Sequence, residues 1–193
     1  MKIIEPSVEL IDEFDSDAVL KKLERCGRVC YQSEPKGKPE EFIRMLIKRG
    51  HESVLEHVSL TFRIICDRGV LAELTRHRLA SYSVESTRYC KYGELTFIKP
   101  CYWTGNEYEA WENFCRSVEG YHQNFSRQST PEQTRCLLPL SLKTELYMTA
   151  NLREWRHVLK LRISSKAHPQ MREVAGKILA VFKEKLPVIV EDI

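Results

Sequence analysis

Two segments of the chain alternate apolar and polar residues, and this alternation constrains the fold more than any other feature. In residues 58–64, VSLTFRI, apolar side chains occupy every second position, and residues 144–151, TELYMTAN, alternate in the same way. A period of two is typical of a strand with one buried face. Segments with helical periodicity lie between them, without the regular strand–helix rhythm of a parallel sheet. The pattern therefore predicts an α+β fold, with helices packed on an antiparallel or mixed sheet.

Apolar residues spaced three and four apart predict the helices. In chain order, we expect helices over residues 15–31, 38–50, 69–78 and 108–125, a short strand over 94–100, a helix that opens at Thr130 and stops at Pro139, a helix after Asn151 and a closing helix from near Pro169. The first helix begins after Ser16 or Asp17, and Thr130 and Asn151 each have Gln or Glu three residues later, which is the spacing of a capping box. The apolar seam of the long helix packs on a core or on another subunit; it consists of Tyr108, Trp111, Cys115, Val118, His122 and Phe125.

The composition is that of an ordinary globular protein. The 193 residues are 42% hydrophobic and 30% charged, and no repeat or Gly/Ser linker interrupts them. We expect a single domain over residues 1–193. No apolar run reaches the about eighteen residues of a membrane span, and the acidic N-terminus lacks the features of a signal peptide, so we expect a cytoplasmic protein. The net charge of +3 is too small to predict nucleic-acid binding.

Seven cysteines and a histidine-rich segment raise the question of a metal site or disulfides. The number of cysteines is odd and no C-x-x-C occurs, so we expect reduced core thiols. In HESVLEH, His51 and His57 are six residues apart, which places them about 120° apart on a helix, whereas a zinc-binding helix needs histidines four apart. The segment lies between Gly50 and a strand, which predicts a turn. We expect no metal; Ser53 and Glu56 of this turn are free to hydrogen-bond a ligand.

Residues 76–89, RHRLASYSVESTRY, hold three arginines, one histidine and four Ser or Thr residues. The pattern fits a solvated basic face, a nucleic-acid contact or a pocket for phosphorylated small molecules. On a helix, Arg76 and Arg78 point about 200° apart and serve two ligands. If residues 85–89 are extended, Ser86 and Arg88 share a face and form an anion site. No G-x-S-x-G motif marks Ser86 as a nucleophile, and no Rossmann or P-loop motif is present.

A third cationic cluster is NLREWRHVLKLR, residues 151–162. Arg153 and His157 are one helical turn apart and share a face, whereas Arg162 faces away from Arg153. Such a helix is either solvated on both sides or binds two different anions at two different sites.

These clusters, in this order, resemble the flavin-dependent thymidylate synthases, the ThyX family. The family motif is R-H-R, seven residues and S, and here Arg76, His77 and Arg78 are followed by Ser86 and then by Arg88. The upstream GHESVLEHVSLTF and the downstream LPLSLKTELYMTANLREWRHVLKLR match as well. The resemblance covers residues 20–185.

The resemblance implies a ThyX-type fold, assembled as a homotetramer with active sites shared between subunits. It implies reductive methylation of dUMP to dTMP with bound FAD, 5,10-methylenetetrahydrofolate as carbon donor and NADPH as reductant, without an enzyme nucleophile. The implied FAD contacts are Ser53, Glu56, Arg76, His77, Arg78, Asn151, Arg153 and His157. The implied dUMP contacts are Glu73, Arg76, Ser86, Thr87, Arg88, Arg135 and Arg162.

Within this set, the resemblance makes Arg162 the catalytic residue, which stabilises negative charge on the pyrimidine. Glu73 stands where many relatives carry Gln. Two alternatives remain: a nucleic-acid-binding module that uses the basic stretch, and a flavin-binding protein that has kept the scaffold without synthase activity. Small-molecule substrates and other copies of the chain are the expected partners, with no nucleic acid and no membrane.

Overall fold

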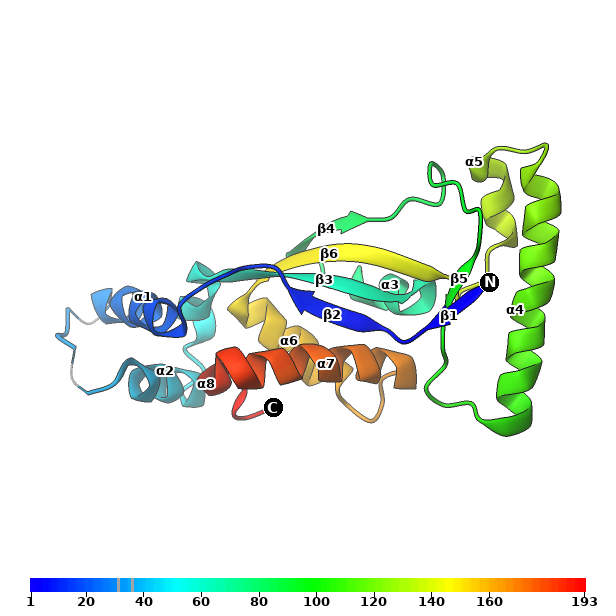
Figure 1. Cartoon of the computed structure of the whole chain (residues 1–193). Coiled ribbons are helices and arrows are strands. Elements are labelled where there is room, and N and C mark those ends of the chain that lie inside the picture. The colour runs from blue at the N-terminus through cyan, green and yellow to red at the C-terminus, as the bar shows by residue number, and fades with distance from the viewer. Residues whose placement is uncertain (31, 36) are drawn as a thin grey trace.

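A four-stranded antiparallel sheet forms the centre of the molecule, with strands in the order β2-β3-β6-β4, and β1 and β5 form a separate parallel pair (Figure 1). This computed structural model describes residues 1–30, 32–35 and 37–193. The strands are β1 (Lys2–Ile4), β2 (Ser7–Leu10), β3 (Ser59–Asp67), β4 (Ala80–Val84), β5 (Thr96–Ile98) and β6 (Lys143–Asn151). The α+β prediction is confirmed, and so are the strands expected near 58–64, 94–100 and 144–151.

The two long strands predicted from alternation pair with each other at the middle of the sheet. Phe62 of β3 lies opposite Met148 of β6, and Ile64 lies opposite Leu146. All four side chains are fully buried. Because side chains alternate across a strand, this register places the buried residues of both strands on one face, while Ile65 and Tyr147 lie on the other.

Helices cover that apolar face. The helical segments are α1 (Ser16–Val29), α2 (Pro39–Lys48), the 3₁₀ helix η1 (Glu52–His57), α3 (Arg68–Leu74), α4 (Gly105–Ser126), α5 (Pro131–Thr134), the 3₁₀ helix η2 (Arg135–Leu137), α6 (Leu152–Arg162), α7 (Pro169–Lys185) and α8 (Pro187–Val190). Figure 1 shows α6 and α7 along one side of the sheet. Trp155 of α6 meets Phe62 edge to face at 4.9 Å between ring centroids, and its indole N–H donates to the Leu60 carbonyl at 3.0 Å. The main core therefore lies between the sheet and these helices.

The opposite face of the sheet carries polar side chains. The Thr61 and Thr149 hydroxyls lie 3.0 Å apart, and Arg63 bridges Glu145 at 2.7 Å and Glu9 at 3.1 Å across three strands. No described helix packs on this face in the view of Figure 1. One side of the sheet is thus left open for other contacts.

A buried arginine fixes the end of the chain against α6. Arg156 is 1% exposed and forms a bidentate ion pair with Asp192 at 2.7 and 2.8 Å and a second ion pair with Glu52 at 3.0 Å. It also donates to the Ile189 carbonyl. Ion pairing offsets the cost of burying a guanidinium, although the Nε of Arg156 has no hydrogen-bond partner among the described residues. Arg156 therefore joins η1, α6 and the C-terminus, and it is a structural cation of the third cluster.

Helix α4 packs on a second, smaller core at the far end of the molecule. Trp111 and Cys115 are buried there against Phe97 of β5 and Leu142. The predicted seam therefore packs on a core of its own chain over most of its length, although Phe125, at its end, is 53% exposed.

Three predicted boundaries were wrong. The helix expected over 69–78 ends at Leu74, where the Thr75 hydroxyl donates back to the Leu71 carbonyl. The helix expected up to Pro139 is α-helical only to Thr134 and continues as η2, although its Thr130 N–H does donate to the Gln133 side chain at 3.0 Å. The N-cap of α1 is Asp15, one residue before those expected, and the predicted last residue of that helix, Tyr31, lies outside the described residues.

Candidate active site

Helix α6 starts at a side-chain cap and carries the third cationic cluster. Strand β6 delivers Asn151, whose side-chain oxygen accepts the Glu154 N–H at 2.9 Å, as the capping-box spacing predicted. Arg153, in the first turn, pairs with Glu56 of η1 at 2.6 Å. Arg162, in the last turn, has different partners on α3. The prediction that Arg153 and Arg162 face different surroundings is confirmed.

Arg162 is held by a hydrogen bond from each of its three nitrogens. Its Nε donates to Nε2 of His77 at 3.0 Å, Nη1 donates to the Glu73 carboxylate at 2.7 Å, and Nη2 donates to the Glu73 carbonyl at 3.1 Å. The side chain is nevertheless 20% exposed. A guanidinium has five N–H donors, so N–H groups of Arg162 remain for a ligand in a fixed geometry.

The surroundings of His77 determine its protonation state and which ring nitrogen carries the proton. Burial, followed by the charges of Arg162 and His157, lowers the pKa of His77 to about 4, so the ring is neutral at neutral pH. Because Nε2 accepts from Arg162, the hydrogen-bond network places the ring proton on Nδ1. Nδ1 lies 3.6 Å from the carboxylate of the buried Glu154, whose own pKa burial raises. Both ring nitrogens of His77 thus face protein groups, and the ring is fixed as an acceptor for Arg162.

The two arginines beside His77 point away from this cluster into solvent. Because α3 ends at Leu74, the Arg76–His77–Arg78 motif lies in the turn that leads to β4. Arg76 and Arg78 are exposed, and neither forms an ion pair with any residue that the structure describes. Two unpaired cations on one short turn are available for an anionic ligand.

The segment after β4 is a turn, so the condition under which Ser86 and Arg88 would share the face of an extended segment is not met. The Ser86 carbonyl accepts the Cys90 N–H at 3.0 Å, and the Ser86 hydroxyl accepts the Arg88 N–H at 3.3 Å. Thr87 is buried. Hydroxyl-to-backbone bonding of this kind competes with strand formation. Arg88 and Ser86 still lie together, held by a turn in place of a strand face.

Arg88 reaches the helical hairpin at the far end of the molecule. Its Nε and Nη2 lie 3.0 and 2.8 Å from the carboxylate of Glu132 in α5, and its side chain is 50% exposed. Arg135, three residues after Glu132, begins η2 and is also exposed. The Arg88–Glu132 pair thus brings the loop after β4 to the segment that carries Arg135.

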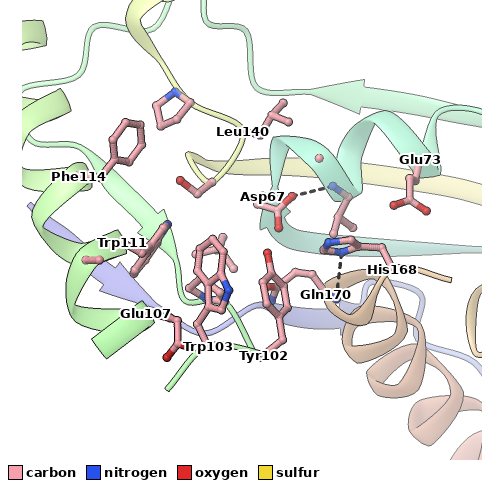
Figure 2. Close-up of a pocket in the computed structure, with 17 residues that line it drawn as sticks. Asp67, Glu73, Tyr102, Trp103, Glu107, Trp111, Phe114, Leu140, His168 and Gln170 are labelled. Carbon is pink, nitrogen blue, oxygen red and sulfur yellow. Dashed lines mark hydrogen bonds between the residues drawn. The ribbon is translucent and has the colours of Figure 1, made fainter. Parts of the chain in front are cut away.

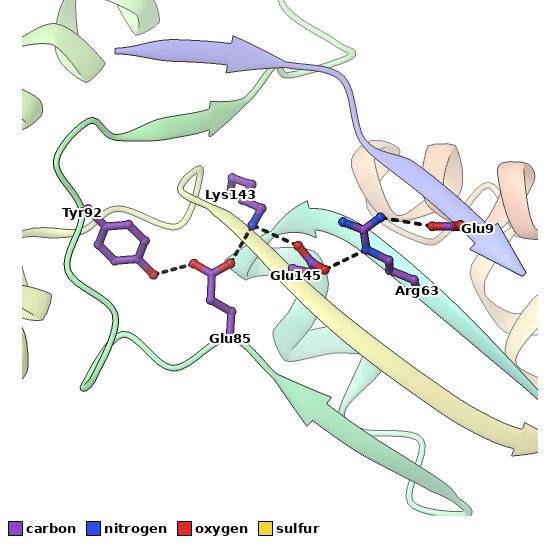
Figure 3. Close-up of polar contacts among 6 residues, drawn as sticks. All are labelled: Glu9, Arg63, Glu85, Tyr92, Lys143 and Glu145. Atoms are coloured by element: carbon purple, nitrogen blue, oxygen red, sulfur yellow. Dashed lines mark hydrogen bonds and ion pairs between the residues drawn. The ribbon is translucent and has the colours of Figure 1, made fainter. Parts of the chain in front are cut away.

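A network of ion pairs and hydrogen bonds fixes both ends of this loop (Figure 3). Glu85 accepts the Tyr92 hydroxyl at 2.6 Å and Lys143 at 2.6 Å, and Lys143 and Arg63 both contact Glu145. Burial, then the hydrogen bond to Glu85, raises the pKa of Tyr92. The Glu85–Tyr92 contact closes the loop at its base, and the network anchors it to β6 and β3.

The predicted dUMP residues therefore fall into two groups within one chain. Glu73 and Arg162 contact each other at the end of α6, and Arg76 follows Glu73 in the adjacent turn. Ser86, Thr87, Arg88 and Arg135 lie between the loop after β4 and the segment from α5 to η2. None of the side-chain hydrogen bonds among described residues connects one group to the other.

The predicted FAD residues are split as well. Ser53 and Glu56 lie on η1, next to Arg153 and Asn151 at the start of α6. Arg76 and Arg78 lie in the turn after α3. His157 connects the two positions, since its ring lies 5.8 Å from that of His77, measured between centroids.

The histidine-rich segment and the cysteines form no metal centre among the described residues. HESVLEH is the 3₁₀ helix η1, close to the predicted turn, and both histidines are exposed. All seven cysteines lie in the described part of the chain as free thiols, as expected, but only Cys66 and Cys115 are buried. Cys30, Cys101 and Cys136 are exposed, so the prediction of core thiols was wrong for these three. No described helix is both long and apolar enough to cross a membrane.

Comparison with known proteins identifies the family of this site. The profile of the family described as thymidylate synthase complementing protein, Thy1, matches residues 9–188. A probable flavin-dependent thymidylate synthase of Mycobacterium phage D29 is 34% identical over 88% of this chain and 81% of its own length. The flavin-dependent thymidylate synthase of Thermotoga neapolitana is 32% identical over 93% of this chain and 87% of its own. The chain belongs to the flavin-dependent thymidylate synthase family.

A solved structure agrees in fold. The UMP/dUMP methylase PolB from Streptomyces cacaoi, bound with 5-Br dUMP, has a TM-score of 0.82, with 24% identity over 99% of this chain and 96% of that one. At this identity the likeness shows the fold alone. The resemblance drawn from the three motifs, and the α+β fold that it implied, are thereby confirmed for this member of the flavin-dependent thymidylate synthase family.

The sequence motifs missed one large feature of this family member. A cavity of about 880 Å³ opens between α3, α4 and the start of α7 (Figure 2). Its aromatic residues are Tyr102, Trp103, Trp111 and Phe114, and the only predicted site residue in its wall is Glu73. The aromatic-rich stretch CYWTGNEYEAW, residues 101–111, contained the signal, but an aromatic at helical spacing is more often part of a core.

Proposed function

We propose that this protein is an FAD-dependent thymidylate synthase that converts dUMP to dTMP, with 5,10-methylenetetrahydrofolate as carbon donor and NADPH as reductant. The observation that carries the proposal is the arrangement of Arg162, whose guanidinium is fixed by His77 and Glu73 while N–H donors remain for a ligand. Preorganised donors at the position where charge develops are a main source of catalytic rate. Membership in the family supplies the chemistry that this arrangement serves.

In the proposed reaction Arg162 contacts the uracil ring. As the pyrimidine becomes electron-rich, the remaining N–H groups of Arg162 stabilise its negative charge. Glu73 and His77 act before substrate arrives, because they hold the guanidinium in one orientation and remove the entropy cost of ordering it. His77 is neutral, so it places no second positive charge beside the guanidinium of Arg162.

The second group of residues binds the phosphate. Arg88 and Arg135 are exposed guanidinium groups, which suit bidentate contacts with phosphate oxygens, and Ser86 and Thr87 add hydroxyl groups on the same loop. Ser86 acts as a ligand: its hydroxyl accepts a backbone N–H at 3.3 Å, and no described His, Lys or carboxylate side chain hydrogen-bonds to it as a base. A nucleophilic serine needs such a base.

The residues around η1 and the turn after α3 fit FAD. A dinucleotide carries a diphosphate, and the exposed Arg76 and Arg78, unpaired within the described chain, supply matching positive charge. Asn151 and Arg153 lie at the start of α6, next to Ser53 and Glu56 of η1, and His157 lies one turn further along α6. When bound, FAD carries the reducing equivalents and relays the one-carbon unit, so the protein needs no nucleophile of its own.

We further propose a homotetramer in which neighbouring subunits complete each site. The support is the separation of the dUMP residues into two groups within one chain, together with the open polar face of the sheet. A single domain over residues 1–193 that supplies both groups to different sites fits this assembly.

The proposal is tested by measuring dTMP formation. Protein purified with FAD should be yellow, should reduce its flavin with NADPH, and should convert dUMP to dTMP only when methylenetetrahydrofolate is present. UMP should be run in parallel, because the PolB neighbour is a UMP/dUMP methylase. Yellow protein that forms no dTMP or methylated UMP contradicts synthase activity, and colourless protein with salt-dependent oligonucleotide binding favours a nucleic-acid-binding module.

The assembly is tested by light scattering, which should report four chains per particle. A monomer that keeps FAD and full activity contradicts the shared site. Ser86→Ala should weaken dUMP binding and leave measurable turnover, whereas a trapped adduct between Ser86 and the pyrimidine contradicts its role as a ligand.

A further inference from the structure

The cavity between α3 and α4 has walls of a different chemistry from the arginine-rich sites. Figure 2 shows Trp103, Trp111 and Phe114 on one side and Asp67 and His168 on the other. Its volume of about 880 Å³ suits a small organic molecule, because ligand pockets are concave, mostly apolar and carry a few polar groups that fix orientation.

Acidic side chains dominate the charged groups of the cavity. Asp67, Glu73 and Glu107 line it, and none of its lining residues in the described chain is Lys or Arg. The groups that bind phosphates elsewhere in the molecule are therefore missing here. A phosphate or carboxylate in this cavity would meet the carboxylates of Asp67 and Glu107, besides that of Glu73, which already holds Arg162, and this disfavours anionic ligands.

The polar corner of the cavity is built by helix caps. Asp67 is the N-cap of α3 and accepts the Val70 N–H at 2.7 Å. Burial raises the pKa of Asp67, and backbone N–H groups of α3 and the charge of His168 act against this rise. His168 caps α7, since its Nδ1 accepts the Gln170 N–H at 3.2 Å, so a neutral His168 carries its ring proton on Nε2. A carboxylate and a ring N–H thus occupy one corner.

Hydrogen bonds of Gln170 hold the aromatic wall of the cavity in place. Gln170 is 2% exposed, and its amide accepts the Cys101 N–H at 3.3 Å and donates to the Lys99 carbonyl at 3.3 Å. This clamp fixes the segment that carries Tyr102 and Trp103, whose rings meet edge to face at 5.1 Å. Tyr102 also meets His168 at 90° and 5.4 Å. The rings are therefore positioned by the chain before any ligand enters.

We propose that this cavity is a separate binding site for a planar aromatic ligand whose edge carries a cationic or multiply N–H-donating group, of the amidine or amino-heteroaromatic class. The aromatic side chains stack on the ring and favour its positive charge. The Asp67 carboxylate accepts hydrogen bonds from the N–H groups at the edge of the ligand. The site requires neither FAD nor dUMP and does not depend on the proposed reaction.

A series of three probes of one shape and different charge tests the proposal. Benzamidine is a planar aromatic cation, benzamide is its neutral counterpart and benzoate its anion. Binding to the purified holoprotein is measured by ligand-observed NMR and by tryptophan fluorescence. Two of the three tryptophans, Trp103 and Trp111, line the cavity, while Trp155 is fully buried in the main core. We expect benzamidine to bind about tenfold or more tighter than benzamide, and benzoate not to bind.

Three variants locate the binding. Asp67→Asn should remove the preference for benzamidine over benzamide and keep the protein folded, because Asn and Asp cap helices equally well. Trp103→Leu, at a side chain that is 39% exposed, should weaken all binding and remove most of the fluorescence change. Glu184→Gln, in the last turn of α7 and away from the cavity, should leave the affinity unchanged.

Equal affinity for the three probes, or benzamidine binding that Asp67→Asn and Trp103→Leu leave intact, overturns the proposal. It is also overturned if benzamidine fails to bind and acrylamide does not quench the fluorescence of Trp103. That result means that a neighbouring subunit fills the cavity. None of these outcomes depends on dTMP formation. A protein that fails the synthase assay and still discriminates the probes separates the two proposals.

Discussion

The end of α6 and the loop after β4 hold their arginines in different ways. At the end of α6, Arg162 is 20% exposed and is held by His77 and by two groups of Glu73. After β4, Arg88 is 50% exposed and has one carboxylate partner, Glu132, which is itself 60% exposed. The first cation is ordered before a ligand arrives; the second has to exchange an exposed ion pair for the ligand. The difference matches the roles that we propose, in which Arg162 acts in the transition state and Arg88 captures a phosphate.

The largest expected effect is that of removing the ordered cation. Arg162→Ala should lower dTMP formation by about 100- to 1,000-fold, which is the usual cost of losing one preorganised donor. FAD content and flavin reduction by NADPH should stay largely intact. Arg162→Lys should restore little, since a point charge lacks the planar arrangement of donors. Loss of flavin from Arg162→Ala, with full activity in the remaining holoenzyme, contradicts the assignment.

Mixed assemblies test whether the two regions serve one site from different chains. Arg162→Ala and Arg88→Ala chains should each be inactive or weak alone, and each carries the region that the other lacks. If each site takes the two regions from different subunits, random one-to-one mixing leaves about a quarter of the sites intact. Steady-state turnover of co-refolded chains should recover to about that fraction. Activity no higher than the mean of the two variants indicates that one chain supplies both regions.

A smaller loss of turnover is expected when Arg162 is kept and the hydrogen-bond acceptor of its Nε–H is removed. His77→Leu removes the acceptor of the Arg162 Nε–H, whereas His77→Gln can place an oxygen at the same position. Losing a hydrogen bond to a charged group costs about 1.5–3 kcal/mol, so His77→Leu should lower turnover by about tenfold or more, and His77→Gln should recover much of it. In an Arg162→Ala background the same change should have no further effect on turnover. Equal losses of turnover in His77→Leu and His77→Gln indicate that His77 acts through packing alone.

The neutral state of His77 also predicts a dependence of stability on pH. The pKa of His77 is lowered to about 4 from an ordinary value of 6.5. Between these values the unfolded chain binds the proton more readily than the folded one, so the free energy of unfolding decreases as the pH falls from 6.5 toward 4. Glu154, His157 and Arg162 face the same ring and remain in His77→Gln. Urea unfolding at pH 6.5 and 4.5 should show a larger loss in the wild type than in His77→Gln, and equal losses rule out the neutral buried ring.

The smallest effect is expected at the exposed ion pair. Glu132→Gln removes the partner that Arg88 has to leave when it takes a phosphate. Exposed pairs contribute about 0.2–1 kcal/mol, so this variant should bind dUMP up to about fivefold more tightly in calorimetric titration. Glu112→Gln, which breaks the exposed Arg116–Glu112 pair on α4, is the matched control and should leave the affinity unchanged. Weaker binding in Glu132→Gln means that Glu132 orders Arg88 for the ligand.

The sequence predicted those parts of the molecule whose causes are local. The alternation in β3 and β6 and the cap at Asn151 depend on neighbouring residues, and the structure has both. The end of α3 was missed because His77 turns inward to Arg162, which is 85 residues away along the chain. A local pattern carries no information about that partner. The extended conformation considered for residues 85–89 does not form, and the hydroxyl of Ser86 accepts a backbone N–H of its own turn instead.

The cavity was missed for a related reason. Its walls come from α3, from the loop before α4, from α4 itself and from the start of α7, and no single segment shows a motif. Trp111 has the spacing of a core residue and does pack on the second core, while its other side faces the cavity. Only the fold reveals that one residue serves both.

Glu73 has a similar double position, with a consequence for how the molecule responds to its ligands. Its carboxylate holds Arg162 and also lines the aromatic cavity. An anion that draws Arg162 toward itself releases negative charge at the cavity, and a cation in the cavity that draws Glu73 releases positive charge at the anion site. If both proposed sites bind their ligands, each ligand should raise the affinity for the other, and thermodynamic reciprocity makes the two factors equal. The proposed catalytic site and the proposed cavity site are thereby linked through a single side chain.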